Sequence, residues 1–97
     1  MNEDRDRALA LLKATHQFPV EYHLSVITRH EETVFAILRT AVEAGPGGPL
    51  AEDAYERVAS SGGKYASHRF RVRCATAEEV LELYARVTAV EGVLNIL

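Results

Sequence analysis

The chain has 97 residues, of which 47% are apolar and 26% charged, and its formal net charge is −3. This length supports one compact domain with a single core. The negative charge excludes a general attraction of the whole surface for nucleic acid or anionic membranes. The one cysteine, Cys74, cannot form an internal disulfide, and the N-terminal residues contain no apolar run long enough for a signal peptide or a membrane span. We therefore expect a cytoplasmic protein.

The N-terminal residues predict a short accessory helix over residues 4–14. Its apolar residues form only a small patch, and Asp4 or Asp6 can cap its first turn. We assign residues 1–17 to an N-terminal helical extension with a connector, and residues 18–97 to the domain proper.

A strand and a helix follow the connector. Residues 22–28 alternate between apolar and polar side chains, which predicts a strand with one buried face. At Thr28 the apolar period changes to 3.6 residues, and Thr28 with Glu31 matches a capping box, so we expect a helix to begin there. The Gly- and Pro-rich residues 45–49 end this helix.

A β-hairpin is predicted next. Residues 50–59 alternate poorly and carry charge, which is typical of an edge strand. Residues 60–64 form a tight turn, because glycine accepts positive φ and serine hydroxyls bond the local backbone. The strand after the turn alternates strictly, with one side apolar and the other cationic. The apolar side consists of Phe70, Val72 and Cys74, and the cationic side of Arg69, Arg71 and Arg73.

The C-terminal part predicts a second helix and a last strand. Thr76 and Glu79 form another capping box, and apolar residues recur at helical spacing up to Val90. Gly92 ends the helix, and residues 93–97 form a short apolar strand.

This order of elements predicts an α+β fold. Two strand-helix-strand halves with right-handed crossovers interleave into a ferredoxin-like split βαββαβ sandwich. We expect a four-stranded antiparallel sheet in the order 4-1-3-2, with two helices on one face and the short N-terminal helix added. The strands over residues 22–28 and 66–74 then lie side by side in the centre.

Several short motifs resemble the YbeD-like family of small bacterial proteins over residues 18 to 97. They are Phe18-Pro19, the hairpin residues Ser60, Ser61, Gly63, Tyr65 and Ser67, Leu83-Tyr84, and the ending Val93-x-x-x-Leu97. Members of that family are uncharacterised and have an ACT-like, ferredoxin-like fold. The resemblance implies a regulatory or interaction role. Thr28 stands where the family pattern tends to a glycine.

The arginines of the central strand are the first candidate site. If the helices cover the opposite face, then Arg69, Arg71 and Arg73 stand on the open face beside His23 and Ser25. RNA-recognition domains of this topology read bases on such a face, but their stacking aromatics are missing here. A solvated or partner-facing charged surface is therefore favoured over nucleic-acid binding. An acidic protein partner is one candidate for it, because arginine suits bidentate contact with carboxylates.

Two further places could hold a ligand. The resemblance to ACT domains implies a small-molecule effector site at the first strand–helix junction, at Thr28, Arg29 and His30, although a helix cap explains these residues without a ligand. The serines and Tyr65 of the hairpin turn could bind phosphate, but turn geometry accounts for them first.

Catalysis and metal binding find less support. The four histidines lack ligand spacing and no cysteine pair accompanies them, so we expect no metal and no cofactor. No nucleophile has an evident paired base. Acylphosphatases share the fold, and Arg29 is superficially placed like their arginine, but their phosphate loop is absent.

We therefore expect a non-enzymatic regulatory or adaptor domain that binds a protein partner or a small-molecule effector. Nucleic-acid binding on the open face is the alternative, and an acylphosphatase-like hydrolase is a third hypothesis. Apolar Ile27 on the polar side of its strand, together with the uneven edge strand, permits a homodimer without requiring one.

Overall fold

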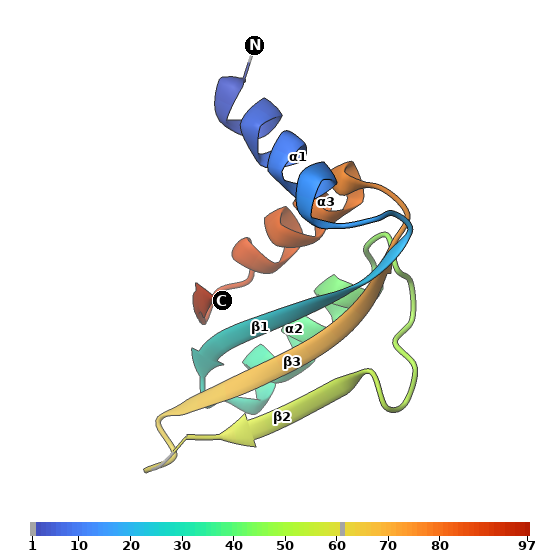
Figure 1. Cartoon of the computed structure of the whole chain (residues 1–97). Coiled ribbons are helices and arrows are strands. Elements are labelled where there is room, and N and C mark those ends of the chain that lie inside the picture. The colour runs from blue at the N-terminus through green and yellow to red at the C-terminus, as the bar shows by residue number, and fades with distance from the viewer. Residues whose placement is uncertain (1, 61) are drawn as a thin grey trace.

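The computed structural model describes residues 2–60 and 62–97, which form three helices and four strands (Figure 1). In chain order these are α1 (Glu3–Thr15), β1 (Val20–Arg29), α2 (Glu32–Glu43), β2 (Tyr55–Ala59), β3 (Tyr65–Cys74), α3 (Ala77–Thr88) and β4 (Val93–Ile96). No helix in this described part is both long enough and apolar enough to cross a membrane.

The four strands form one antiparallel sheet in the order β2-β3-β1-β4, which reads 4-1-3-2 from the β4 edge. β1 and β3 pair along their whole length, from Val20 opposite Cys74 to Arg29 opposite Tyr65. The two strands with the strictest alternation therefore occupy the centre, as predicted. The edge strands β2 and β4 have only five and four residues, which limits the unpaired backbone that the sheet exposes.

The core lies between one face of the sheet and the helices α2 and α3. Helix α2 is seen behind β1 and β3 in Figure 1. Even-numbered residues of β1 and β3 point into it, and their odd-numbered neighbours point to the uncovered face. The sheet contributes Leu24, Val26, Phe70, Val72 and Cys74, and the helices contribute Leu38, Val42, Val80, Leu83 and Val87. We call the uncovered side the open face.

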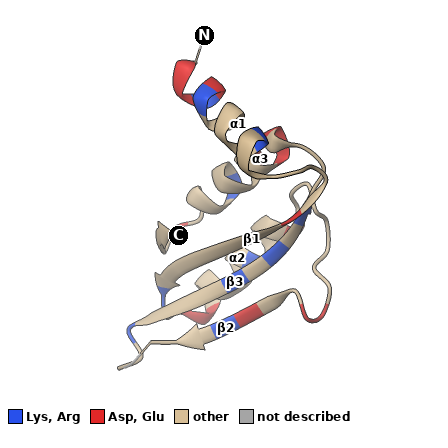
Figure 2. Ribbon diagram, viewed as in Figure 1, with Lys and Arg blue, Asp and Glu red and all other residues tan. Residues whose placement is uncertain are grey.

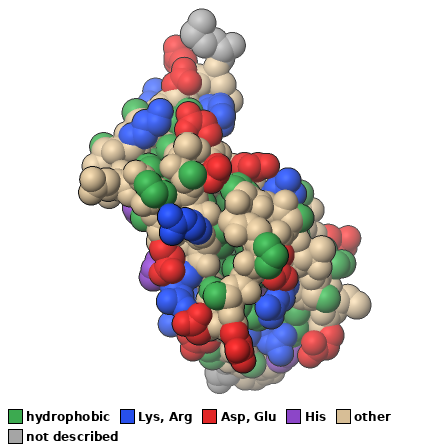
Figure 3. Space-filling view, turned by 90° about the vertical axis from the view of Figure 1, so that its right-hand side faces the viewer, with side chains coloured by type: hydrophobic (Ala, Val, Ile, Leu, Met, Phe, Trp, Pro, Cys, Tyr) green, Lys and Arg blue, Asp and Glu red, His purple; other side chains and the backbone are tan. Residues whose placement is uncertain are grey.

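Helix α1 projects away from the sheet and packs on α3 (Figures 1 and 3). None of its residues is buried, and an exposed ion pair joins Lys13 Nζ to Glu78 Oε2 at 3.7 Å. Asn2 caps its first turn by accepting a hydrogen bond from the amide of Arg5, so the predicted Asp4 or Asp6 cap is wrong. Helix α1 is therefore an accessory element, as its weak apolar pattern indicated.

The first predicted capping box is also wrong. Strand β1 continues through Thr28 to Arg29, and α2 begins only at Glu32, after an N-cap residue, Glu31, whose side chain makes no capping bond. Thr28 is fully buried and its hydroxyl is bonded inside the sandwich, so it is not available to a helix end.

The second capping box is confirmed. The amide of Glu79 donates to Thr76 Oγ1 at 3.2 Å, and Glu79 Oε1 accepts from the amide of Ala75 at 2.7 Å. The same four-residue pattern thus caps one helix and not the other, because only Thr28 has a buried partner elsewhere in the fold.

Gly92 should tolerate no side chain. Its φ is +99°, and an added Cβ would lie 2.7 Å from a Cγ atom of Val34. We expect Gly92→Ala to lower the free energy of unfolding by about 2–4 kcal/mol, measured by urea denaturation. Gly48→Ala is the matched control, because φ is +67° there and nothing lies within 4 Å of an added Cβ. Equal losses for the two variants would contradict the steric contact with Val34.

Candidate functional site on the open sheet face

The open face presents the predicted row of arginines on a central strand. Arg69 and Arg73 are exposed and Arg71 is half-buried, in alternation with buried neighbours. Across the strand pair, Arg69 lies opposite Ser25 and Arg71 opposite His23, which confirms the predicted grouping. Figure 2 shows the basic residues following one another along β3, with acidic residues on β2 and on the loop before it.

The three arginines differ in their partners. Arg71 Nη2 lies 3.2 Å from a carboxylate oxygen of Asp53 and also donates to the Asp53 carbonyl, while its Nη1 lies 3.8 Å from Glu21 Oε1. Among residues 2–60 and 62–97, Arg69 and Arg73 have no carboxylate within 4.0 Å. Two of the three guanidinium groups therefore remain available to an outside anion.

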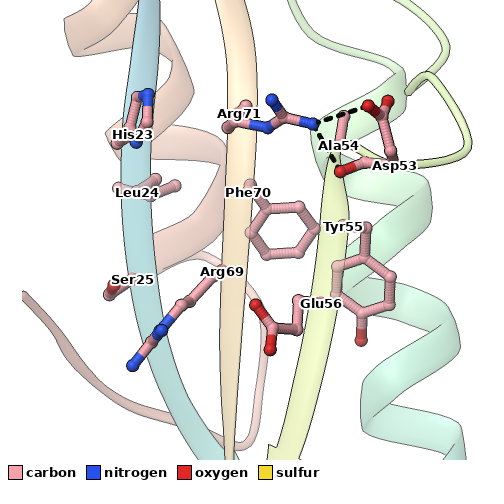
Figure 4. Close-up of a pocket in the computed structure, with 10 residues that line it drawn as sticks. All are labelled: His23, Leu24, Ser25, Asp53, Ala54, Tyr55, Glu56, Arg69, Phe70 and Arg71. Carbon is pink, nitrogen blue, oxygen red and sulfur yellow. Dashed lines mark hydrogen bonds and ion pairs between the residues drawn. The ribbon is translucent and has the colours of Figure 1, made fainter.

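A hollow of about 200 Å³ lies on this face between β1 and β2 (Figure 4). Arg71 crosses toward Asp53, whereas Arg69 and Glu56 project from adjacent strands at paired positions without a bond between them. The walls of this hollow thus carry both positive and negative side chains. This mixture suits a polar group with both donors and acceptors, and it disfavours a large apolar ligand.

An apolar hollow of about 300 Å³ lies at the hairpin end of the same face. Ile27, Val58 and Tyr65 line it with Ser67, and Val58 and Tyr65 are 50% and 48% exposed. The Tyr65 side chain therefore stands on the surface at the end of the turn. From the sequence we placed Ile27 on this face but not Val58 or Tyr65. The odd numbering that Tyr65 shares with the arginines of β3 would have placed it there.

The residues of the first strand–helix junction are not brought together. Thr28 points toward the helices and is buried, while Arg29, the last residue of β1, is exposed. Arg29 Nε lies 2.6 Å from Glu31 Oε2, and its Nη2 lies 4.0 Å from Glu91. His30 is exposed. With its charge paired in this way, Arg29 is poorly suited to cradle a phosphate.

The hydroxyl of Thr28 belongs to a buried hydrogen-bonded chain centred on His68. It donates to the Arg29 carbonyl at 2.8 Å, so it accepts from His68 Nε2 at 2.9 Å. His68 Nδ1 then accepts from the hydroxyl of Tyr55 at 2.7 Å. Burial, together with the nearby charge of Arg57, lowers the pKa of His68 to about 4, which keeps the ring neutral. This histidine is structural.

The hairpin motif uses its polar groups within the turn. Ser60 Oγ accepts from the amide of Tyr65 at 3.0 Å, and the Ser60 carbonyl accepts from the amide of Gly63 at 3.0 Å. Gly63 has a φ of +71°, as the turn requires. Ser67 is half-buried on the open face, and Ser61 lies outside the described residues. The backbone amides of Gly63 and Tyr65, which bond to Ser60, are therefore not available to a phosphate.

Other reactive groups are few in the described part of the chain. It contains no group of three or more His, Cys, Asp or Glu side chains arranged to hold a metal ion. Cys74 is a free thiol with no exposed surface, and burial raises its pKa to about 11. A thiol with so high a pKa is a poor nucleophile near neutral pH.

The fold and the site define a small α+β domain with an uncovered, arginine-bearing sheet face. The chain belongs to the family described as "Protein of unknown function (DUF493)", whose model matches residues 13–97. This is the YbeD-like family that the hairpin motif predicted. The match takes in the end of α1 and everything after it. No curated protein and no solved structure was found to match the chain significantly.

The buried His68 makes stability depend on pH. The unfolded chain binds a proton at His68 near the ordinary pKa of 6.5, whereas the folded chain does so only near 4. The stability is therefore full above about pH 7 and falls as the pH drops from 6.5 to 4, by up to about 3 kcal/mol. Nuclear magnetic resonance of the His68 ring protons, recorded against pH, measures its folded-state pKa directly.

The matched variant is His68→Gln, whose amide keeps a donor and an acceptor but does not titrate. Its free energy of unfolding should lose less between pH 6.5 and 4 than that of the unchanged protein. A His68 ring that titrates near 6.5 in the folded protein would contradict the buried, neutral assignment.

Proposed function

We propose that this protein is a non-enzymatic binding domain of the regulatory or adaptor type, and that it works through the open face. The main support for this proposal is that Arg69 and Arg73 are exposed and that neither forms an ion pair among the described residues. Both stand on β3, which pairs with β1 along its whole length and with β2 up to Phe70, so their backbone is held in place before they bind. Guanidinium groups in such positions favour bidentate contact with carboxylates.

We also propose that the domain is ferredoxin-like and ACT-like. The βαββαβ order after α1, the strand order and the placement of α2 and α3 against one face support this proposal. Such folds serve many unrelated functions, so the functional argument rests on the surface and not on the architecture.

The spacing of the two arginines favours a macromolecular partner over a small effector. Four residues along a strand separate them by about 13 Å. That separation, measured along the backbone, is long for a small effector, whereas carboxylates along a protein segment can match it. At the alternative effector site, the Thr28 hydroxyl and the Arg29 guanidinium already have partners within the chain.

The test compares the unchanged protein with Arg69→Glu/Arg73→Glu in quantitative co-purification from cells. We expect the double variant to lose most of the specifically recovered partner protein, because two attractive charges become repulsive. Arg5→Glu/Arg7→Glu is the control, since it makes the same change of net charge on exposed residues of α1. Equal partner recovery with all three proteins would reject the open face as the binding surface.

Nucleic-acid binding is the second candidate, and one observation favours it. Tyr65 is 48% exposed and shares the open face with the arginines, which supplies one surface on which a base could stack. Glu21 and Glu56 on the same face oppose it, because they repel phosphates.

A salt titration with single-stranded RNA separates this candidate from the first. RNA binding through Arg69 and Arg73 requires an affinity that falls with added salt, with a slope of about two released counterions at most. It should also weaken with Tyr65→Ala and remain unchanged with Tyr84→Phe, which retains its ring on α3. We expect no binding at low ionic strength, and binding with these properties would favour RNA.

A further inference from the structure

The open face changes from apolar to cationic along β3. At the hairpin end lies the apolar hollow of Ile27, Val58 and Tyr65, with Ser67 beside them. These apolar side chains come from three adjacent strands, so the sheet hydrogen bonds fix their relative positions. Isolated exposed apolar residues are common, but a hollow lined from three strands has a defined shape.

The unpaired arginines stand at fixed distances from this hollow. Arg69 and Arg73 follow Ser67 by two and six residues on the same side of β3. With a rise of about 3.3 Å per residue, the backbones of Arg69 and Arg73 lie about 7 and 20 Å along β3 from Ser67. Arg71 stands between them, but Asp53 and Glu21 hold its guanidinium group.

We propose that the open face binds an acidic peptide segment of a partner protein, with a bulky apolar side chain in the apolar hollow and carboxylates on Arg69 and Arg73. An extended peptide has nearly the same rise per residue as β3. The carboxylates therefore belong two and six residues after the apolar anchor, and the peptide runs in the direction of β3. This inference rests on the proposed function and names the class of partner.

The acidic residues of the face favour this partner over a polyanion. Glu56 lies at the position paired with Arg69, and Glu21 at the position paired with Arg73. A chain with a negative charge at every unit would bring some of its charges against these carboxylates. A peptide with two carboxylates, one at each arginine, and neutral residues between them meets less of that repulsion, and its apolar anchor gains contacts that a phosphate chain does not offer.

The probe is the end-blocked peptide Leu-Ser-Glu-Ser-Ser-Ser-Glu, titrated into ¹⁵N-labelled full-length protein while amide chemical shifts are recorded. We expect saturable shifts that cluster at the apolar hollow and along β3. Replacing the peptide's leucine with serine, or both glutamates with glutamine, should each weaken binding by about tenfold or more.

Variants of the protein test the same contacts from the other side. Val58→Glu places a charge in the apolar hollow and should weaken binding by about tenfold or more. Ile37→Glu is the matched control, because Ile37 is 56% exposed on α2, behind the sheet, and should leave the affinity unchanged. Equal effects of the two variants would overturn the placement of the anchor.

The outcomes distinguish this inference from the proposed function. Equal affinity for the leucine and serine peptides overturns the apolar anchor and leaves the arginine surface standing. Absence of shifts with every peptide overturns the inference, and the proposed function then stands if Arg69→Glu/Arg73→Glu still loses its partner. If that double variant recovers its partner fully, the proposed function fails too. Tighter binding of single-stranded RNA at the same residues would also overturn the inference.

Discussion

The central position of β3 is the constraint on which the rest of this structure depends. Because β1 and β2 bond to its two sides, its side chains can point only toward the helices or away from them. Phe70, Val72 and Cys74 fill the core, and the arginines between them are therefore held on the open face. A slip of one residue in register would bury three guanidinium groups, so the packing of the core also fixes the surface.

How much the sequence predicts depends on whether local or distant residues decide each feature. Strict alternation along residues 66–74 identified the central strand and its two faces, and no distant contact opposed it. The capping pattern at Thr76 also correctly predicted the start of a helix, whereas the same pattern at Thr28 did not. The partner that decides the second case is His68, forty residues further along the chain, and nothing in the local pattern reveals it. Likewise, only the folded path of the loop before β2 brings Asp53 to Arg71 and leaves Arg69 without a carboxylate.

The candidate surface depends on a contact made on the opposite side of the sheet. Tyr55 stacks on Phe70 and donates its hydroxyl to His68, so it fastens the short edge strand to the core. With Tyr55 directed inward, the alternation of β2 directs Glu56 and Val58 outward. The weak pattern of this edge strand in the sequence hid that result, because its one strongly apolar anchor is a tyrosine with a polar tip. A buried hydrogen bond thus helps to shape the face that we propose for recognition.

The position of Cys74, the only cysteine of the chain, has a consequence for how unfolding of this protein can be followed. Cys74 ends the central strand, has no surface accessible to solvent, and keeps its proton at neutral pH. Alkylating reagents and oxidants can reach it only when the sheet separates from the helices. The rate at which Cys74 is modified therefore measures how often the core opens, because the chain contains no other thiol.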